Sequence, residues 1–142
     1  MKFVQPSPKH EVRAAWITAV YGLDWPRTKA TTPTAIRRQQ EELTDILDKL
    51  KAANFNTILF QTRTRGDVLY HSSIEPYNSI LTGKVDGDPG YDPLAFAVRE
   101  CHKRGMECHA WMVAIPLGNK KHVASLGNKS VTKQRKEICI PY

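Results

Sequence analysis

The sequence is short of the features that mark several classes of protein. It has no run of about 18 apolar residues, the length that a membrane-spanning helix needs. Its three cysteines, Cys101, Cys108 and Cys139, are too few and of the wrong parity for a disulfide-stapled scaffold. Neither GxGxxG nor GxxxxGK[ST] occurs, so no glycine-rich phosphate-binding loop is indicated. The chain therefore gives no sign of a membrane span, a disulfide framework or a common nucleotide site.

A secretory signal peptide is also not indicated in this chain. Residues 1–10 contain no apolar run. The apolar segment 14–23 resembles such a signal, but Asp24-Trp25-Pro26 follows it in place of a small-residue cleavage site. We interpret this segment as a buried strand followed by a loop.

Positive charge is concentrated near the end of the chain. The formal net charge is +7, and residues 112–136 hold six basic side chains without any Asp or Glu. The rest of the chain is balanced, with 15 basic against 14 acidic residues. Such a stretch is compatible with binding to nucleic acid, a membrane surface or an acidic polymer. A solvated loop is the simplest interpretation, and we expect one here.

Short apolar segments alternate with amphipathic ones along the chain. Apolar composition predicts strands at about 12–18, 57–62 and 106–113, and helical spacing predicts helices at about 34–53 and 93–104. Thr32 or Thr34 can cap the first helix, with Pro33 in its first turn. Asp92-Pro93 begins the second helix in the same way, and Gly105 ends it. After Val113 the alternation fades.

A β-α-β-α-β order with nearly continuous apolar strands predicts an α/β fold with a parallel sheet covered by helices. A doubly wound sheet and a (β/α)8 TIM barrel both fit, and both place their chemistry at the carboxyl ends of the strands. A barrel usually takes about 250 residues. We therefore expect residues 1–142 to be a partial barrel, the N-terminal part of a single domain.

The second strand carries polar residues toward its carboxyl end. Alternation places Thr57, Leu59, Gln61 and Arg63 on one side of the sheet, and Ile58, Phe60 and Thr62 on the side suited to packing under helices. Gln61 and Arg63 are costly to bury unless they are paired or bind a ligand. The sequence leaves two hypotheses open: these side chains line a ligand site, or they pair inside the fold with Glu11 or Asp67.

Aromatic side chains gather at the same predicted edge. In the third strand, His109 and Trp111 share a side and lie near the mouth of the sheet. An indole ring suits the apolar face of a sugar, and its N–H can still bond a hydroxyl group. Further aromatics near the strand ends are Trp16, Trp25, Tyr70, Tyr77 and Tyr91. Any one of them is better explained by packing, but their grouping favours a carbohydrate ligand.

Glycoside hydrolysis needs two carboxylates that flank the bond. The acids near the predicted loops are Asp24, Asp67, Glu75, Asp86, Asp88 and Asp92. Asp92 is explained as a helix cap, and Asp86 and Asp88 as turn residues. Asp67 is the best ligand-facing acid, and no convincing catalytic pair is present. The Cys and His side chains of Cys101-His102 and Cys108-His109 diverge, so we expect no metal site.

Several segments of the chain form an ordered set of motifs. The opening strand reads E-x-R-x-x-W, and the second strand reads N-x-x-x-x-Q-x-R. The segments of the set are Glu11–Trp16, Leu23–Pro26, Asn56–Arg63, Gly66–Tyr70 with Ser72, Leu81–Gly83, Gly90–Leu94 and His102–Trp111. In this order and spacing they resemble the glycosyl hydrolase family 10-like barrel proteins of bacterial envelopes.

The resemblance implies a (β/α)8 glycoside hydrolase that acts on cell-wall glycans of the peptidoglycan kind in the bacterial envelope, with no cofactor. Related barrels place their acid and nucleophile or base around strands four and seven. We therefore expect the catalytic residues beyond residue 142, and no hydrolysis by this chain alone. The substrate-binding residues expected here are Trp16, Gln61, Arg63, Asp67, His109 and Trp111.

Two other functions compete with this one. The first is a non-catalytic carbohydrate-binding or scaffold module of the same fold, which carboxylates at the ends of later strands would argue against. The second is a basic nucleic-acid-binding domain, whose affinity would fall steeply with salt. No nucleic-acid motif is present, so we expect a polysaccharide partner and no nucleic acid.

Overall fold

The computed structural model describes residues 11–139 and contains one three-stranded parallel sheet. The strands are β1 (Ala14–Ile17), β2 (Thr57–Arg63) and β3 (Glu107–Met112), and the sheet order is β1-β2-β3. Two long helices, α1 (Pro33–Ala52) and α2 (Pro93–Lys103), connect consecutive strands. The structure therefore confirms an α/β fold with parallel strands, as expected for part of a (β/α)8 barrel.

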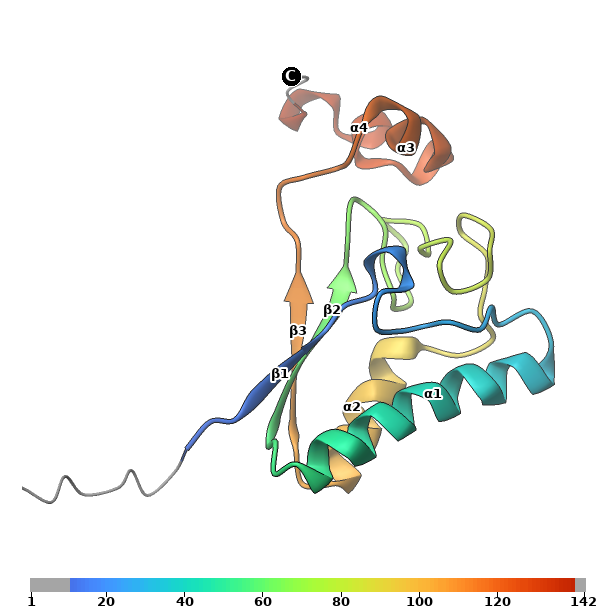
Figure 1. Cartoon of the computed structure of the whole chain (residues 1–142). Helices are drawn as coiled ribbons and strands as arrows, with labels where there is room; N and C mark the ends of the chain where they lie inside the picture. Colours follow the sequence, from blue (N-terminus) through green and yellow to red (C-terminus); the bar gives the residue numbers. More distant parts are fainter. Residues whose placement is uncertain (1–10, 140–142) are drawn as a thin grey trace, which may run out of the picture.

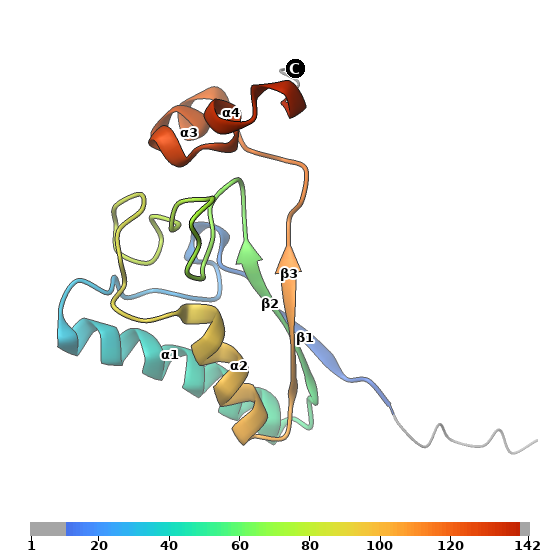
Figure 2. The ribbon, with the colours of Figure 1, turned by 180° about the vertical axis from the view of Figure 1, so that it is seen from behind.

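Both long helices lie on one face of the sheet (Figures 1 and 2). The core between them is apolar: α1 contributes Leu43 and Leu47, and α2 contributes Cys101. From the sheet, Ile58 and Phe60 are fully buried beneath the helices. The other face of the sheet carries the alternate residues of each strand. Within residues 11–139 neither long helix covers that face, which in a closed barrel is the interior.

The helix ends follow the capping signals of the sequence. The Thr32 hydroxyl accepts a hydrogen bond from the N–H of Ala35 at 3.1 Å, which selects Thr32 rather than Thr34 as the cap. The Asp92 carboxylate accepts from the N–H of Ala95 at 2.9 Å. Gly105 takes a φ of 62° just after α2, a conformation that residues with a side chain rarely adopt. These signals fix where each helix begins and how the chain enters β3.

The carboxyl end of β2 departs from regular geometry. Gln61 pairs with Trp111 and Arg63 with Met112, so the register shifts by one residue between Gln61 and Arg63. A shift of this kind re-aims the side chains that follow it. Strict alternation therefore applies up to Gln61 but does not place Arg63.

The basic segment after β3 is folded, and our expectation of a solvated loop there is wrong. It forms α3 (Lys120–Ser125), α4 (Val131–Gln134) and the short turns η2 (Gly127–Lys129) and η3 (Lys136–Ile138). Leu126 and Ser130 are 3% and 1% exposed. These helices are too short to show helical periodicity in the sequence, which is why the sequence does not predict them.

This segment lies beyond the carboxyl ends of β2 and β3 (Figure 1). The His122 ring nitrogen Nε2 lies 3.0 Å from the carbonyl oxygen of Arg65, and the Gln134 amide donates to the carbonyl of Ile74 at 3.2 Å. A Cβ at Gly66 would lie 3.3 Å from Leu126, so the close approach depends on glycine at that position. The segment is thus attached to the loop that follows β2.

None of the helices within residues 11–139 has both the length and the apolar character needed to cross a bilayer.

Candidate functional site

The two tryptophans on the open face of the sheet are in direct contact. Trp16 lies in β1 and Trp111 in β3, and their ring centroids are 4.7 Å apart with the planes at 89°. Because β2 separates these strands, their backbones are roughly 10 Å apart and the indoles meet across the middle strand. Trp16 is 58% exposed and Trp111 is partly exposed. The pair is an accessible aromatic surface on the face that the long helices leave open.

His109 lies on the same face, two residues before Trp111 and opposite Leu59. Its Nε2 atom is 2.9 Å from a carboxylate oxygen of Glu107, and both side chains are exposed. Imidazole and carboxylate groups in this position can bond sugar hydroxyls as well as each other. His109 therefore shares the open face with the tryptophan pair, and its polar atoms are accessible there.

Gln61 is buried and holds the chain that leaves β1. Its Oε1 atom accepts hydrogen bonds from the N–H groups of Ala19 and Val20, at 2.8 and 2.9 Å. The side chain is 3% exposed. Among the described residues Gln61 makes no hydrogen bond to Glu11 or Asp67; its observed partners are the backbone N–H groups of Ala19 and Val20. Gln61 positions the loop after Trp16.

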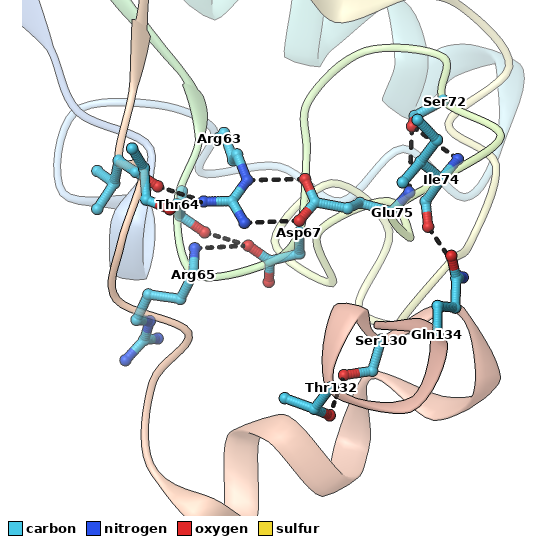
Figure 3. A network of polar contacts seen from close by, with 12 residues as sticks. Arg63, Thr64, Arg65, Asp67, Ser72, Ile74, Glu75, Ser130, Thr132 and Gln134 are labelled. Atoms are coloured by element: carbon cyan, nitrogen blue, oxygen red, sulfur yellow. Dashed lines mark hydrogen bonds and ion pairs between the residues drawn. The ribbon is translucent and has the colours of Figure 1, made fainter. Parts of the chain in front are cut away.

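Arg63 forms a buried ion pair with Glu75 (Figure 3). The two side chains make a bidentate contact, Nε to Oε2 at 2.7 Å and Nη2 to Oε1 at 2.6 Å. Their side chains are only 10% and 9% exposed. The hydrogen bonds to Glu75 raise the pKa of Arg63, against the opposing effect of burial. The partner of Arg63 is thus Glu75, not Glu11 or Asp67, because the register shift and the loop bring that carboxylate to it.

The remaining donor of Arg63 ties down the chain that leaves β3. Its Nη1 atom donates to the carbonyl oxygens of Val113 and, at 3.2 Å, Ala114. The guanidinium group therefore joins the loop after β2 to the chain after β3, and few of its donors are left for a ligand. In this structure Arg63 is an anchor of the strand ends.

Asp67 also points into the protein. One carboxylate oxygen accepts from the hydroxyl of Thr64 and, at 3.2 Å, from the N–H of Arg65. The other lies 3.6 Å from Nε2 of His122 in α3. Asp67 is 3% exposed, so it shapes the tight turn 64–67 and faces the C-terminal helices. Of the six predicted binding residues, the structure groups Trp16, His109 and Trp111 on the open face and buries Gln61, Arg63 and Asp67 in contacts that position loops.

Every acid considered for catalysis has a structural partner. Asp24 accepts from the N–H of Thr18, Asp88 from the N–H of Gly90, and Asp92 caps α2. Asp86 pairs with Lys129 at 2.8 Å. Together with the buried Asp67 and Glu75, these contacts occupy all six candidates. The described residues thus supply acids that organise loops.

The structure also reveals a buried polar residue that sequence reasoning missed, Gln39 of α1. Its amide donates to the carbonyls of Thr28 and Leu81, at 2.6 and 2.9 Å, and accepts from the hydroxyl of Tyr91 at 2.6 Å. The Trp25 indole donates to its backbone carbonyl at 2.8 Å. Gln39 is fully buried. A signal was present, since position 39 lies on the apolar stripe that includes Ile36, Leu43 and Leu47.

Two further polar side chains meet at the ends of β1 and β2. The guanidinium carbon of Arg65 lies 4.9 Å from the ring centroid of Tyr21, and Nη1 donates to the Tyr21 hydroxyl at 2.9 Å. Tyr21 has a positive φ of 57° in the turn η1 (Val20–Gly22). Neither residue stands out in the sequence, because the contact joins two irregular loops.

A metal centre is not formed by the residues that the structure describes. Residues 11–139 contain no group of three or more His, Cys, Asp or Glu side chains close enough to hold an ion. Cys101 and Cys108 do meet beneath α2, where a hydrogen bond from Cys101 lowers the pKa of Cys108. His109, by contrast, lies on the opposite face of the strand from Cys108.

Comparisons with known proteins agree with this architecture. The family model for glycosyl hydrolase-like 10 matches residues 11–139. The chain is 42% identical over 104 residues to glycosyl hydrolase DigH of Escherichia coli K12. This match covers 70% of the present chain and 24% of DigH. It is 40% identical over 101 residues to glycosyl hydrolase YngK of Bacillus subtilis, covering 71% and 19% respectively. The matched segment thus spans about a quarter or less of these relatives. The chain belongs to the glycosyl hydrolase-like 10 family.

Proposed function

We propose that this chain contributes the first three strands of a (β/α)8 glycosidase that hydrolyses O-glycosidic bonds in a bacterial cell-wall or related polysaccharide. In this proposal the enzyme works in the bacterial cell envelope. The open face of the sheet, with Trp16, His109 and Trp111, binds the glycan. Gln61, Arg63 and Asp67 hold the loops around that face in place.

The contact between Trp16 and Trp111 is the observation that carries the proposal. Contiguous exposed aromatic surface is typical of a place where another molecule binds. The two rings pack edge to face, with their planes at 89°. Sugar rings carry an apolar C–H side that packs on such a face, and both indole N–H groups can bond hydroxyls.

The chemistry of bond cleavage belongs to other carboxylates. A glycosidase needs one carboxyl group as acid and a second as nucleophile or base, roughly 5–10 Å apart across the scissile bond. The candidate acids of this chain are engaged as anchors and caps, which supports the view that the segment binds substrate but does not cleave it. We accordingly expect binding without turnover from the 142-residue chain.

Replacement of Trp111 by alanine tests the proposal. We expect Trp111→Ala to weaken binding of soluble peptidoglycan glycan strands by about tenfold or more, because it removes one of the two stacking surfaces. Isothermal titration calorimetry measures the change. Ile138→Ala is the matched control, since Ile138 is also an exposed apolar side chain, at 61%, but lies in η3. Equal affinity of the wild type and Trp111→Ala would overturn the proposal.

A further inference from the structure

Two of the three cysteines, Cys101 and Cys108, meet where α2 passes into β3. Cys101 belongs to α2 and is fully buried, and Cys108 belongs to β3 and packs against the same apolar core. The N–H of Met106 donates to the carbonyl oxygen of Cys101 at 3.0 Å, so the chain turns back directly after the helix. Met106 and Cys108 lie two residues apart and both face the helices. The short link thus brings two thiols together, and they share a hydrogen bond.

The two thiols have different environments. Cys101 is 0% exposed, and the hydrogen bond to Cys108, together with burial, raises its pKa. The same hydrogen bond lowers the pKa of Cys108, against the opposing effect of burial. Cys101 therefore keeps its proton and donates it toward the sulfur of Cys108, which loses its own proton more readily. Since the thiolate is the reactive form of cysteine, Cys108 is the nucleophile of the pair.

Cys108 can also be reached from the surface. It is partly exposed and lines an open pocket together with residues 102, 105–107 and 109. Because the side chain is only partly exposed, a small oxidant reaches it more easily than a bulky one, and hydrogen peroxide is little larger than water. Cysteines that respond to peroxide combine three features: thiolate character, accessibility and a second thiol beside them that resolves the product. Cys108 and Cys101 together have all three.

We propose that Cys108 is a site of oxidation by hydrogen peroxide and that Cys101 converts the product into a disulfide. The Cys108 thiolate attacks one peroxide oxygen and breaks the O–O bond, giving a sulfenic acid and a hydroxide that takes up the proton lost by the thiol. The sulfur of Cys101 then attacks the sulfenic sulfur, gives up its own proton and expels the oxygen as water. In sum, two thiols and one peroxide give one disulfide and two waters. The new bond ties the end of α2 to β3, and it does not depend on glycan binding.

Tryptic peptide mapping of the peroxide-treated chain, without reduction, tests the inference. Lys103 and Arg104 lie between the two cysteines, so a disulfide appears as two linked peptides that have lost two hydrogen atoms. We expect this linked product, and we expect Cys108 to be consumed about tenfold or more faster than Cys139. Cys139 is the internal control, because it is also partly exposed but its S–H donates to the carbonyl of Arg135, at 3.5 Å. Equal rates for Cys108 and Cys139, or oxidation without the linked peptides, would overturn the proposal.

Two variants separate the roles of the pair. In Cys101→Ala we expect the oxidation of Cys108 to stop at the sulfenic acid, which dimedone traps, because the resolving thiol is gone. In Cys108→Ala we expect Cys101 to stay reduced, because its sulfur is buried. Rapid oxidation of Cys101 in Cys108→Ala would contradict the assignment of Cys108 as the nucleophile. Circular dichroism shows whether each variant is folded, and the map of the wild-type chain decides the question without either variant.

Discussion

Replacing Glu75 by glutamine is expected to lower the free energy of unfolding by about 3 kcal/mol, near the lower end of the range for breaking one partner of a buried ion pair. The substitution keeps the shape of the side chain and removes its charge. Arg63 would then stay charged in a site where its side chain is only 10% exposed. The carbonyls of Val113 and Ala114 still accept from Nη1, which keeps the loss from being larger.

Urea denaturation followed by circular dichroism measures this loss. Glu11→Gln is the matched control, because Glu11 also pairs with an arginine, Arg13, at 2.8 Å. The side chains of that pair are 63% and 46% exposed, so we expect a change below about 1 kcal/mol. If Glu75→Gln destabilised the chain no more than Glu11→Gln, the ion pair would not be the anchor of the strand ends that we describe.

Replacing Gln39 by leucine is expected to cost about 3 kcal/mol of stability. The change leaves the carbonyl of Thr28 and the hydroxyl of Tyr91, both part-buried, without their partner inside the protein, and an unsatisfied group of this kind costs about 1–3 kcal/mol when it is shielded from water. The carbonyl of Leu81 loses less, since it also accepts from the N–H of Ala30 at 2.8 Å. Leucine would add apolar contacts, but it cannot satisfy these groups.

The neighbouring Gln40→Leu makes the same chemical change one residue further along α1. Gln40 is partly exposed, and no side-chain hydrogen bond involves it among residues 11–139, so we expect an effect within about 0.5 kcal/mol. Both variants can be compared by urea denaturation. Similar effects for the two substitutions would show that the contacts of Gln39 do not secure the loops that flank the strand ends.

The layered architecture could be predicted because its signals are local. Asp92-Pro93 and Gly105 mark the two ends of one helix, and the structure uses Asp92 as the cap and Gly105 as the positive-φ residue. The apolar faces of strands and helices follow fixed periods of two and 3.6 residues, so buried residues such as Ile58 and Phe60 could be assigned without coordinates.

The site could be predicted only in part, because its contacts depend on irregular loops. Trp16 and Trp111 come from regular strands; alternation placed Trp111 on the face of His109, whereas Trp16 was grouped with it only by its position near a strand end. The partner of Arg63 did not, because Glu75 lies in a long loop beyond a register shift. The Arg65–Tyr21 contact joins two loops whose course no sequence period describes.

The three tryptophans of the chain allow a direct test of the central claim, that the open face of the sheet binds the glycan. Trp16 and Trp111 lie on that face, whereas Trp25 is fully buried against Phe60 and serves as an internal control. The measurement is a titration of the ¹⁵N-labelled chain with soluble glycan strands, following the three indole N–H signals. Our account predicts that the signals of Trp16 and Trp111 shift to saturation while that of Trp25 stays in place. Binding that leaves Trp16 and Trp111 unperturbed would contradict it.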